Sequence, residues 1–147
     1  MNSQVVYWNK DVECMPREKL EALQLERLKK LVKRVYEKVP FYRQAFKDVG
    51  VKVEDLQKLS DLENFPFTTK NDLRDNYPFN LFAENVDNLI RIHCSSGTTG
   101  KPTVVGYTRN DIDIWAEVAA RSIGCAGGTS KDILQVATLR YLNNNSL

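Results

Sequence analysis

The sequence predicts an α/β protein in which a helical N-terminal portion leads into the first strands of a mixed domain. Apolar residues recur at three- and four-residue steps through residues 16–39, as on one face of an amphipathic helix. After about residue 80, the pattern becomes strand, glycine-rich loop, strand, helix and strand. The predicted divisions are therefore a helical portion over 1–80, the start of an α/β domain over 81–137, and a polar tail over 138–147 that is not expected to pack.

The first long helix is expected to begin at Pro16, a residue favoured at the first helical position, and to end at Pro40. Its apolar stripe consists of Leu20, Leu23, Leu28, Leu31, Val32, Val35 and Val39. A basic cluster of Lys29, Lys30, Lys33 and Arg34 lies between these positions. A solvated helix face is the favoured interpretation of this cluster, and contact with an acidic partner is the alternative.

Shorter helices are expected downstream. An aromatic-rich helix after Pro40 should close at Gly50, a favourable C-cap residue, with its aromatic rings in the core. One or two helical turns are expected within 53–62. Thr69 can cap another short helix, and Asp72 in its first turn suits the positive end of the helix dipole.

Two strands flank the glycine-rich loop in the second half of the chain. They are predicted at Leu89 to Cys94 and at Thr103 to Tyr107. Thr108 and Asp111 resemble a capping box at the start of a helix. The apolar stripe of that helix is Ile112, Trp115, Val118, Ala119 and Ile123. Ile133 to Val136 is predicted as a buried strand.

Composition favours a small-molecule partner. The formal charge of the 147 residues is only +2, so no basic field indicates nucleic acid or an anionic membrane. Cys14, Cys94 and Cys125 fit neither a disulfide framework nor a zinc knuckle, and they are interpreted as reduced thiols, with Cys94 in the core. Without a signal-peptide pattern or a run of membrane-spanning length, the chain is expected to be cytoplasmic.

The stretch Ser95–Thr103 concentrates the chemistry of the chain. Gly97 and Gly100 can adopt positive φ and let the backbone approach a ligand, while hydroxyls and amides donate hydrogen bonds and Lys101 supplies a positive charge. An anion such as a phosphate is the expected ligand. A plain turn between two strands suits the same composition and is the alternative.

This stretch is not a Walker A loop. Such a loop places four residues between its first Gly and the Gly-Lys pair, and a helix follows. Here only Thr98 and Thr99 separate the two glycines, and Pro102 leads into a predicted strand. The chain has no Gly-x-Gly-x-x-Gly fingerprint either. The remaining interpretation is a hydroxyl-rich hairpin loop that closes over a polyphosphate.

The run Ser95-Ser96-Gly97-Thr98-Thr99-Gly100-Lys101-Pro102 resembles the phosphate-binding loop of the adenylate-forming enzymes, the acyl- and aryl-CoA synthetases. Within that superfamily, three further stretches are similar to the phenylacetate-CoA ligases, namely 39–43, 67–78 and 104–108. The resemblance covers roughly residues 5 to 137. It implies the start of the N-terminal, AMP-binding domain of these enzymes, about the first third of a family member.

The resemblance implies a two-step reaction. ATP and an aryl acetate give an acyl adenylate and pyrophosphate, and the thiol of coenzyme A then displaces AMP, with Mg²⁺ and loop donors stabilising the phosphates. The implied ATP contacts are Ser95, Ser96, Gly97, Thr98, Thr99, Gly100 and Lys101. No catalytic residue is assigned within the chain.

His93, the only histidine, lies just before the loop. It could orient a phosphate or the acyl carboxylate, but packing at the end of a strand is the favoured interpretation. Tyr107, Arg109 and Trp115 are expected to help shape the nucleotide domain without a catalytic role.

The family's acyl pocket, its adenine and ribose motifs and its adenylation lysine have no counterpart in the chain, which departs from the family pattern at Thr138. A truncated ligase, inactive by itself, is therefore expected. The rival hypothesis is a non-catalytic module that binds nucleotide weakly, forms a homo-oligomer or associates with a full-length ligase. Which aryl or acyl acid is activated stays open.

Overall fold

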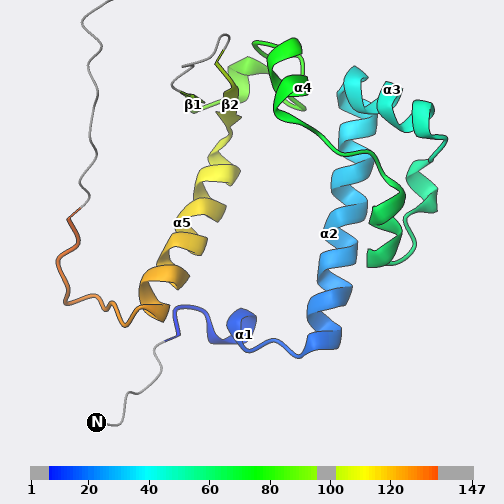
Figure 1. The fold of residues 1–147 in the computed structure, drawn as a ribbon. Coiled ribbons are helices and arrows are strands. Elements are labelled where there is room, and N and C mark those ends of the chain that lie inside the picture. The colour runs from blue at the N-terminus through cyan, green and yellow to red at the C-terminus, as the bar shows by residue number, and fades with distance from the viewer. Residues whose placement is uncertain (1–6, 96–101, 136–147) are drawn as a thin grey trace, which may run out of the picture.

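The structure, a computed structural model, describes residues 7–95 and 102–135. Figure 1 shows two long helices, α2 (Arg17–Lys38) and α5 (Arg109–Cys125), standing apart from each other. The short helix α1 (Lys10–Glu13) lies near one end of both, and α4 (Lys70–Asp75) and the β-hairpin lie near the other. The remaining elements are α3 (Pro40–Val49), the 3-10 turns η1 (Val53–Asp55), η2 (Leu59–Asn64) and η3 (Val86–Asn88), and the strands β1 (Arg91–Cys94) and β2 (Val104–Tyr107).

Helix α2 confirms the predicted long amphipathic helix, but it begins one residue later than predicted. Pro16 is the N-cap, with an extended ψ of 142°, so the first helical residue is Arg17. The helix ends at Lys38, before Pro40, which opens α3. Gly50 closes α3 at φ 75°, the left-handed conformation that a C-cap glycine adopts without strain.

The basic cluster on α2 is largely paired within the chain. Lys30 lies 2.6 Å from Glu26 and Lys33 lies 3.9 Å from Glu37. Arg34 forms an ion pair with Glu84, and Lys29 donates to the side chain of Gln57. These neighbours support the interpretation of the cluster as a solvated helix face.

The hydrophobic core lies between α2, α3 and the 3-10 turns. Val32, Phe46, Leu56 and Phe65 form one buried cluster, and Val39 is also buried. The rings of Phe46 and Phe65 meet edge to face at 5.2 Å. Among the described residues, every buried apolar side chain comes from this first half of the chain.

Capping boxes fix the starts of α4 and α5, as predicted. Thr69 accepts a hydrogen bond from the amide of Asp72, whose carboxylate accepts from the amide of Thr69 at 2.7 Å. The hydroxyl of Thr69 also donates to this carboxylate and, as the main cause, lowers the pKa of Asp72. Thr108 and Asp111 repeat the arrangement at α5. Each box pairs two amides that the helix leaves without partners.

Two sequence predictions for the second half are wrong. Ile133, Leu134 and Gln135 form no strand, and Ile133 is 99% exposed. A strand needs a neighbour to pair its backbone groups, and within the described ranges only β1 and β2 pair. Cys94, which was expected in the core, is exposed. The predicted helix of the second half forms as α5, and its apolar stripe is largely exposed. Val136 and the predicted tail over 138–147 lie outside the described residues.

The segment before α1 binds to α5. The indole Nε1 of Trp8 donates to Glu117 Oε2 at 2.6 Å, and Asn9 Nδ2 donates to Glu117 Oε1 at 3.2 Å. Arg121 lies one helical turn further along and forms a 2.9 Å ion pair with Glu117. The hydrogen bond from Trp8 is the largest of the causes that lower the pKa of Glu117.

Across the described part of the chain, no helix combines the length and the apolar character that crossing a bilayer requires.

We expect Leu56→Ala to lower the free energy of unfolding by about 2–5 kcal/mol, because it leaves a cavity in the core. Leu56 is 1% exposed, whereas Leu62 in η2 is 45% exposed. The control Leu62→Ala should cost less than about 1 kcal/mol. Urea unfolding followed by circular dichroism measures both values. An equal loss of unfolding free energy in both variants would contradict the placement of Leu56 in the core.

The link between Trp8 and Glu117 should loosen in acid. The folded-state pKa of Glu117 lies below its ordinary value, so its stabilisation is fully present above the ordinary pKa and is lost as pH falls through the lowered one. The indole N–H resonance of Trp8 should shift over this acidic range. Glu117→Gln should abolish that pH dependence, and an unchanged titration in the variant would contradict the assignment.

Candidate functional site

The hairpin β1–β2 carries the candidate loop. The strands are antiparallel, with His93 opposite Val105. Their pairing extends past both strands, because the amide of Ile90 donates to the carbonyl of Tyr107 at 2.9 Å and the amide of Ser95 donates to the carbonyl of Thr103 at 3.0 Å. Backbone pairing therefore confirms the two predicted strands and holds the two ends of the loop together.

Ser95 and Thr103 close the hairpin with a second hydrogen bond. The amide of Thr103 donates to Ser95 Oγ at 2.9 Å. A hydroxyl that accepts one hydrogen bond can still donate its own hydrogen. Ser95 can thus close the hairpin and also bind a phosphate oxygen at the edge of the loop.

Ser95 is the one predicted site residue that the structure describes. The other six predicted contacts lie outside the described residues: Ser96, Gly97, Thr98, Thr99, Gly100 and Lys101. Their assignment to ATP phosphates stays a prediction from the sequence. The described geometry fixes where their segment leaves β1 and where it returns to β2.

One face of the hairpin packs on the segment that precedes it. The register places Ile92 and Gly106 on this face. A Cβ atom added at Gly106 would lie 2.6 Å from Leu89 Cδ1 and 2.8 Å from Phe82 Cε2. Glycine at position 106 therefore lets these two side chains approach the backbone of β2, and a larger residue there would force Leu89 or Phe82 to shift.

The opposite face carries an aromatic cluster of His93, Tyr107 and Trp115. The ring of His93 meets Tyr107 edge to face at 5.0 Å and Trp115 at 5.8 Å, and the rings of Tyr107 and Trp115 stack at 5.4 Å. These contacts join the hairpin to α5. They support the interpretation that the His93 ring is held by packing at the end of its strand. Arg109, the first residue of α5, is exposed and takes no part in this cluster.

Sequence reasoning missed a groove of about 690 Å³ between α2 and the hairpin. The Arg34–Glu84 ion pair belongs to its lining, together with Phe82, Leu89 and Gly106. No local pattern could have shown this groove, because its walls come from segments that are far apart in the chain. A second hollow of about 700 Å³ lies beside α2 and α3, where Arg43 donates to the carbonyl oxygens of Tyr36 and Glu37.

Gly106→Ala should destabilise the hairpin by about 1–3 kcal/mol, because the added methyl group overlaps Leu89 and Phe82. The control Val105→Ala removes methyl groups from an exposed position of the same strand. Hydrogen exchange at the amides of Ile90 and Ser95 reports the pairing. Faster exchange in the Gly106 variant alone is expected, and equal exchange in both variants would contradict the packing argument.

No protein-family model matches the chain. The chain is 56% identical over 126 residues to the phenylacetate-coenzyme A ligase of Escherichia coli, covering 86% of this chain and 29% of that protein. It is 58% identical over 117 residues to the phenylacetate-coenzyme A ligase of Thermus thermophilus, covering 80% of this chain and 26% of the relative.

The solved structures that match this chain are also those of CoA ligases. A 2-hydroxyisobutyryl-CoA ligase in complex with 2-HIB-AMP and CoA, in its thioesterification state, matches with a TM-score of 0.74 and 31% identity, covering 80% of this chain and 26% of that chain. The chain spans less than a third of the length of the curated relatives it matches. The fold matches the N-terminal part of the adenylate-forming CoA ligases, and over four fifths of its own length the chain is a homologue of the phenylacetate-CoA ligases.

Proposed function

We propose that this chain supplies the ATP-phosphate loop of an acid–CoA ligase that activates phenylacetate. The observation that carries the proposal is the hairpin closure between Ser95 and Thr103, the described residues on either side of the predicted loop, in a homologue of phenylacetate-coenzyme A ligases. Strand pairing provides a rigid base on which a short loop can present several donors to one ligand.

The proposed reaction begins with adenylation. A carboxylate oxygen of the acid forms a bond to the α-phosphorus of ATP, and the bond from that phosphorus to the bridging oxygen of pyrophosphate breaks. Negative charge grows on the departing pyrophosphate. The hydroxyls of Ser95, Ser96, Thr98 and Thr99, the loop amides and the ammonium of Lys101 would stabilise that charge.

The second proposed step transfers the acyl group. The thiol sulfur of coenzyme A attacks the carbonyl carbon of the acyl adenylate, the thiol proton is lost, and AMP leaves. Within this chain, the loop residues act on the nucleotide and not on the thiol. The catalytic groups of the second step are assigned to the part of a ligase that this chain does not match.

Within 7–95 and 102–135, no group of three or more His, Cys, Asp or Glu side chains lies close enough together to hold a metal ion. The steps proposed for this chain use only its own side chains and amides.

Phenylacetate is the favoured acid because the sequence identity of this chain is higher to the phenylacetate-coenzyme A ligases than to the solved 2-hydroxyisobutyryl-CoA ligases. These relatives are 56–58% identical to the chain, whereas the solved 2-hydroxyisobutyryl-CoA ligases are 28–31% identical. The alternative function is a non-catalytic module that binds nucleotide weakly.

A chimeric ligase tests the proposal. The matched region of the Thermus thermophilus ligase is replaced by the corresponding residues of this chain, and pyrophosphate release is measured with ATP, coenzyme A and phenylacetate. We expect activity that depends on phenylacetate. Lys101→Met in the chimera should lower kcat/KM for ATP by about 100- to 1000-fold, the usual cost of losing one transition-state donor.

The control is Lys131→Met, which removes an equal charge from an exposed position outside the loop. It should leave kcat/KM within about twofold of the parent chimera. A folded chimera without activity would favour the non-catalytic alternative. An active chimera that tolerates Lys101→Met would favour the plain-turn interpretation of the loop.

A further inference from the structure

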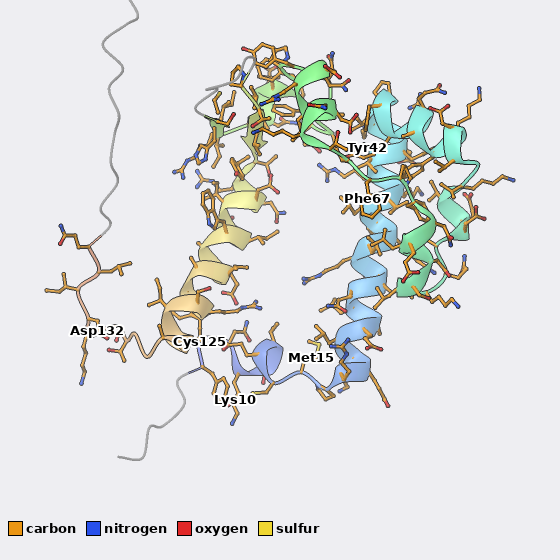
Figure 2. The ribbon with its side chains drawn as sticks, viewed as in Figure 1. Lys10, Met15, Tyr42, Phe67, Cys125 and Asp132 are labelled. Carbon is orange, nitrogen blue, oxygen red and sulfur yellow. The ribbon has the colours of Figure 1, made fainter. Side chains whose placement is uncertain are left out.

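The hollow beside α2 and α3 gathers positive charge. Its volume is about 700 Å³, and all of its walls come from residues 33–54, which belong to the half of the structure with the buried core. Figure 2 shows α3 and the chain that follows it on the side of α2 that points away from α5. Four cationic side chains and two carboxylates line the hollow, so its net charge is positive: Lys33, Arg43, Lys47 and Lys52, with Glu37 and Glu54.

The cations on the α2 side of the hollow already have partners. Arg43 donates from Nε to the carbonyl oxygen of Tyr36 at 3.2 Å and from Nη2 to that of Glu37 at 2.8 Å. Both carbonyls belong to the last turn of α2, where a helix leaves its carbonyl groups without amide partners. Lys33 lies 3.9 Å from the Glu37 carboxylate. Arg43 therefore offsets the partial negative charge of the helix end, which otherwise disfavours an anion.

The cations on the α3 side are Lys47 and Lys52, and their charge is unmatched. The amides of Gly50 and Val51 donate to the carbonyl oxygens of Lys47 and Phe46 at 3.1 and 3.0 Å, which caps the end of α3. Gly50, at φ 75°, reverses the chain and brings Lys52 to the hollow that Lys47 also lines. In the part of the chain that the structure describes, neither lysine forms an ion pair. Two ammonium groups are thus available to one ligand.

We infer that this hollow binds a small organic phosphate monoester. An ammonium group is a compact charge that binds phosphate well, and Lys47 and Lys52 together balance a phosphate dianion. Small-molecule sites typically measure about 300–1,000 Å³, so the hollow has room for an organic group as well as the phosphate. Val51 and Val53 pack against the buried cluster and give the hollow a fixed apolar wall for that group. Glu54 also lines the hollow and opposes the anion.

The inference uses no residue of the glycine-rich loop and does not depend on the proposed ligase reaction. Two sources share the inferred chemistry, namely a nucleoside monophosphate and a phosphate ester without a nucleoside. AMP and phenyl phosphate represent these sources as probes. Inorganic phosphate tests the need for the organic group, and phenylacetate tests the preference for phosphate over a carboxylate.

The test is an amide NMR titration of the isotopically labelled 147-residue chain with each probe. We expect phenyl phosphate to cause saturable shifts at the amides of Gly50, Val51 and Lys52, and to bind at least threefold tighter than inorganic phosphate. The amides of Ser95 and Thr103 report binding at the loop separately, because they lie where the loop leaves and rejoins the hairpin.

Variants test the two ammonium groups. Lys47→Met and Lys52→Met should each weaken phenyl phosphate binding about five- to tenfold, since each removes one charged hydrogen-bond donor. Glu54→Gln should tighten binding about two- to threefold, because it removes an opposing charge. Lys19→Met is the matched control on an exposed position of α2 outside the lining, and it should stay within about twofold of the wild type. Circular dichroism checks that all variants keep their helix content.

The outcomes separate the possibilities. Tighter binding of AMP than of phenyl phosphate at the amides of 47–54 supports the inference with a nucleotide as the ligand, and the reverse order supports it with a phosphate ester that has no nucleoside. The inference is wrong if both probes shift only the loop amides or none, if Lys47→Met and Lys52→Met bind as tightly as the wild type, or if phenylacetate binds as tightly as phenyl phosphate.

Discussion

The backbone pairing of β1 with β2 is the constraint on which the candidate site depends. It brings Ser95 and Thr103 together, although the loop between them spans seven residues. The same pairing sets the register that aligns Gly106 with the packed 79–89 segment and His93 with the aromatic cluster. If the register slipped by one residue, both faces of the hairpin would exchange, and neither contact would form.

The two halves of the structure are stabilised by different means. The first half has a buried cluster around Phe46 and Leu56, with α2 and α3 packed against it. The second half relies on capping boxes, on the hairpin and on polar contacts such as those of Glu117, and the apolar side chains of α5 stay exposed. This contrast agrees with a chain that matches only the first part of much longer ligases.

Local patterns predicted most of the elements, because their causes lie within a few residues. Thr69 with Asp72, Thr108 with Asp111, and Gly50 each mark a helix end through hydrogen bonds or backbone conformation that the neighbouring residues supply. The expected strand at Ile133 was wrong because a strand depends on a partner elsewhere in the chain. For the candidate loop, the structure describes Ser95 and the closing bonds, while the other assigned contacts rest on the sequence.

Short spans of the chain were enough to predict helices α2 to α5, though not α1, as well as the two strands and the resemblance of the Ser95–Lys101 run to a family's phosphate loop. Periodicity, caps and a short motif are all encoded among neighbouring residues. The three-dimensional arrangement was needed to learn that Trp8 binds Glu117, that Trp115 packs on His93, and that the apolar side of α5 faces outward. These features depend on which distant segments meet, and burial is set by everything that packs around a side chain, not by its own apolar character.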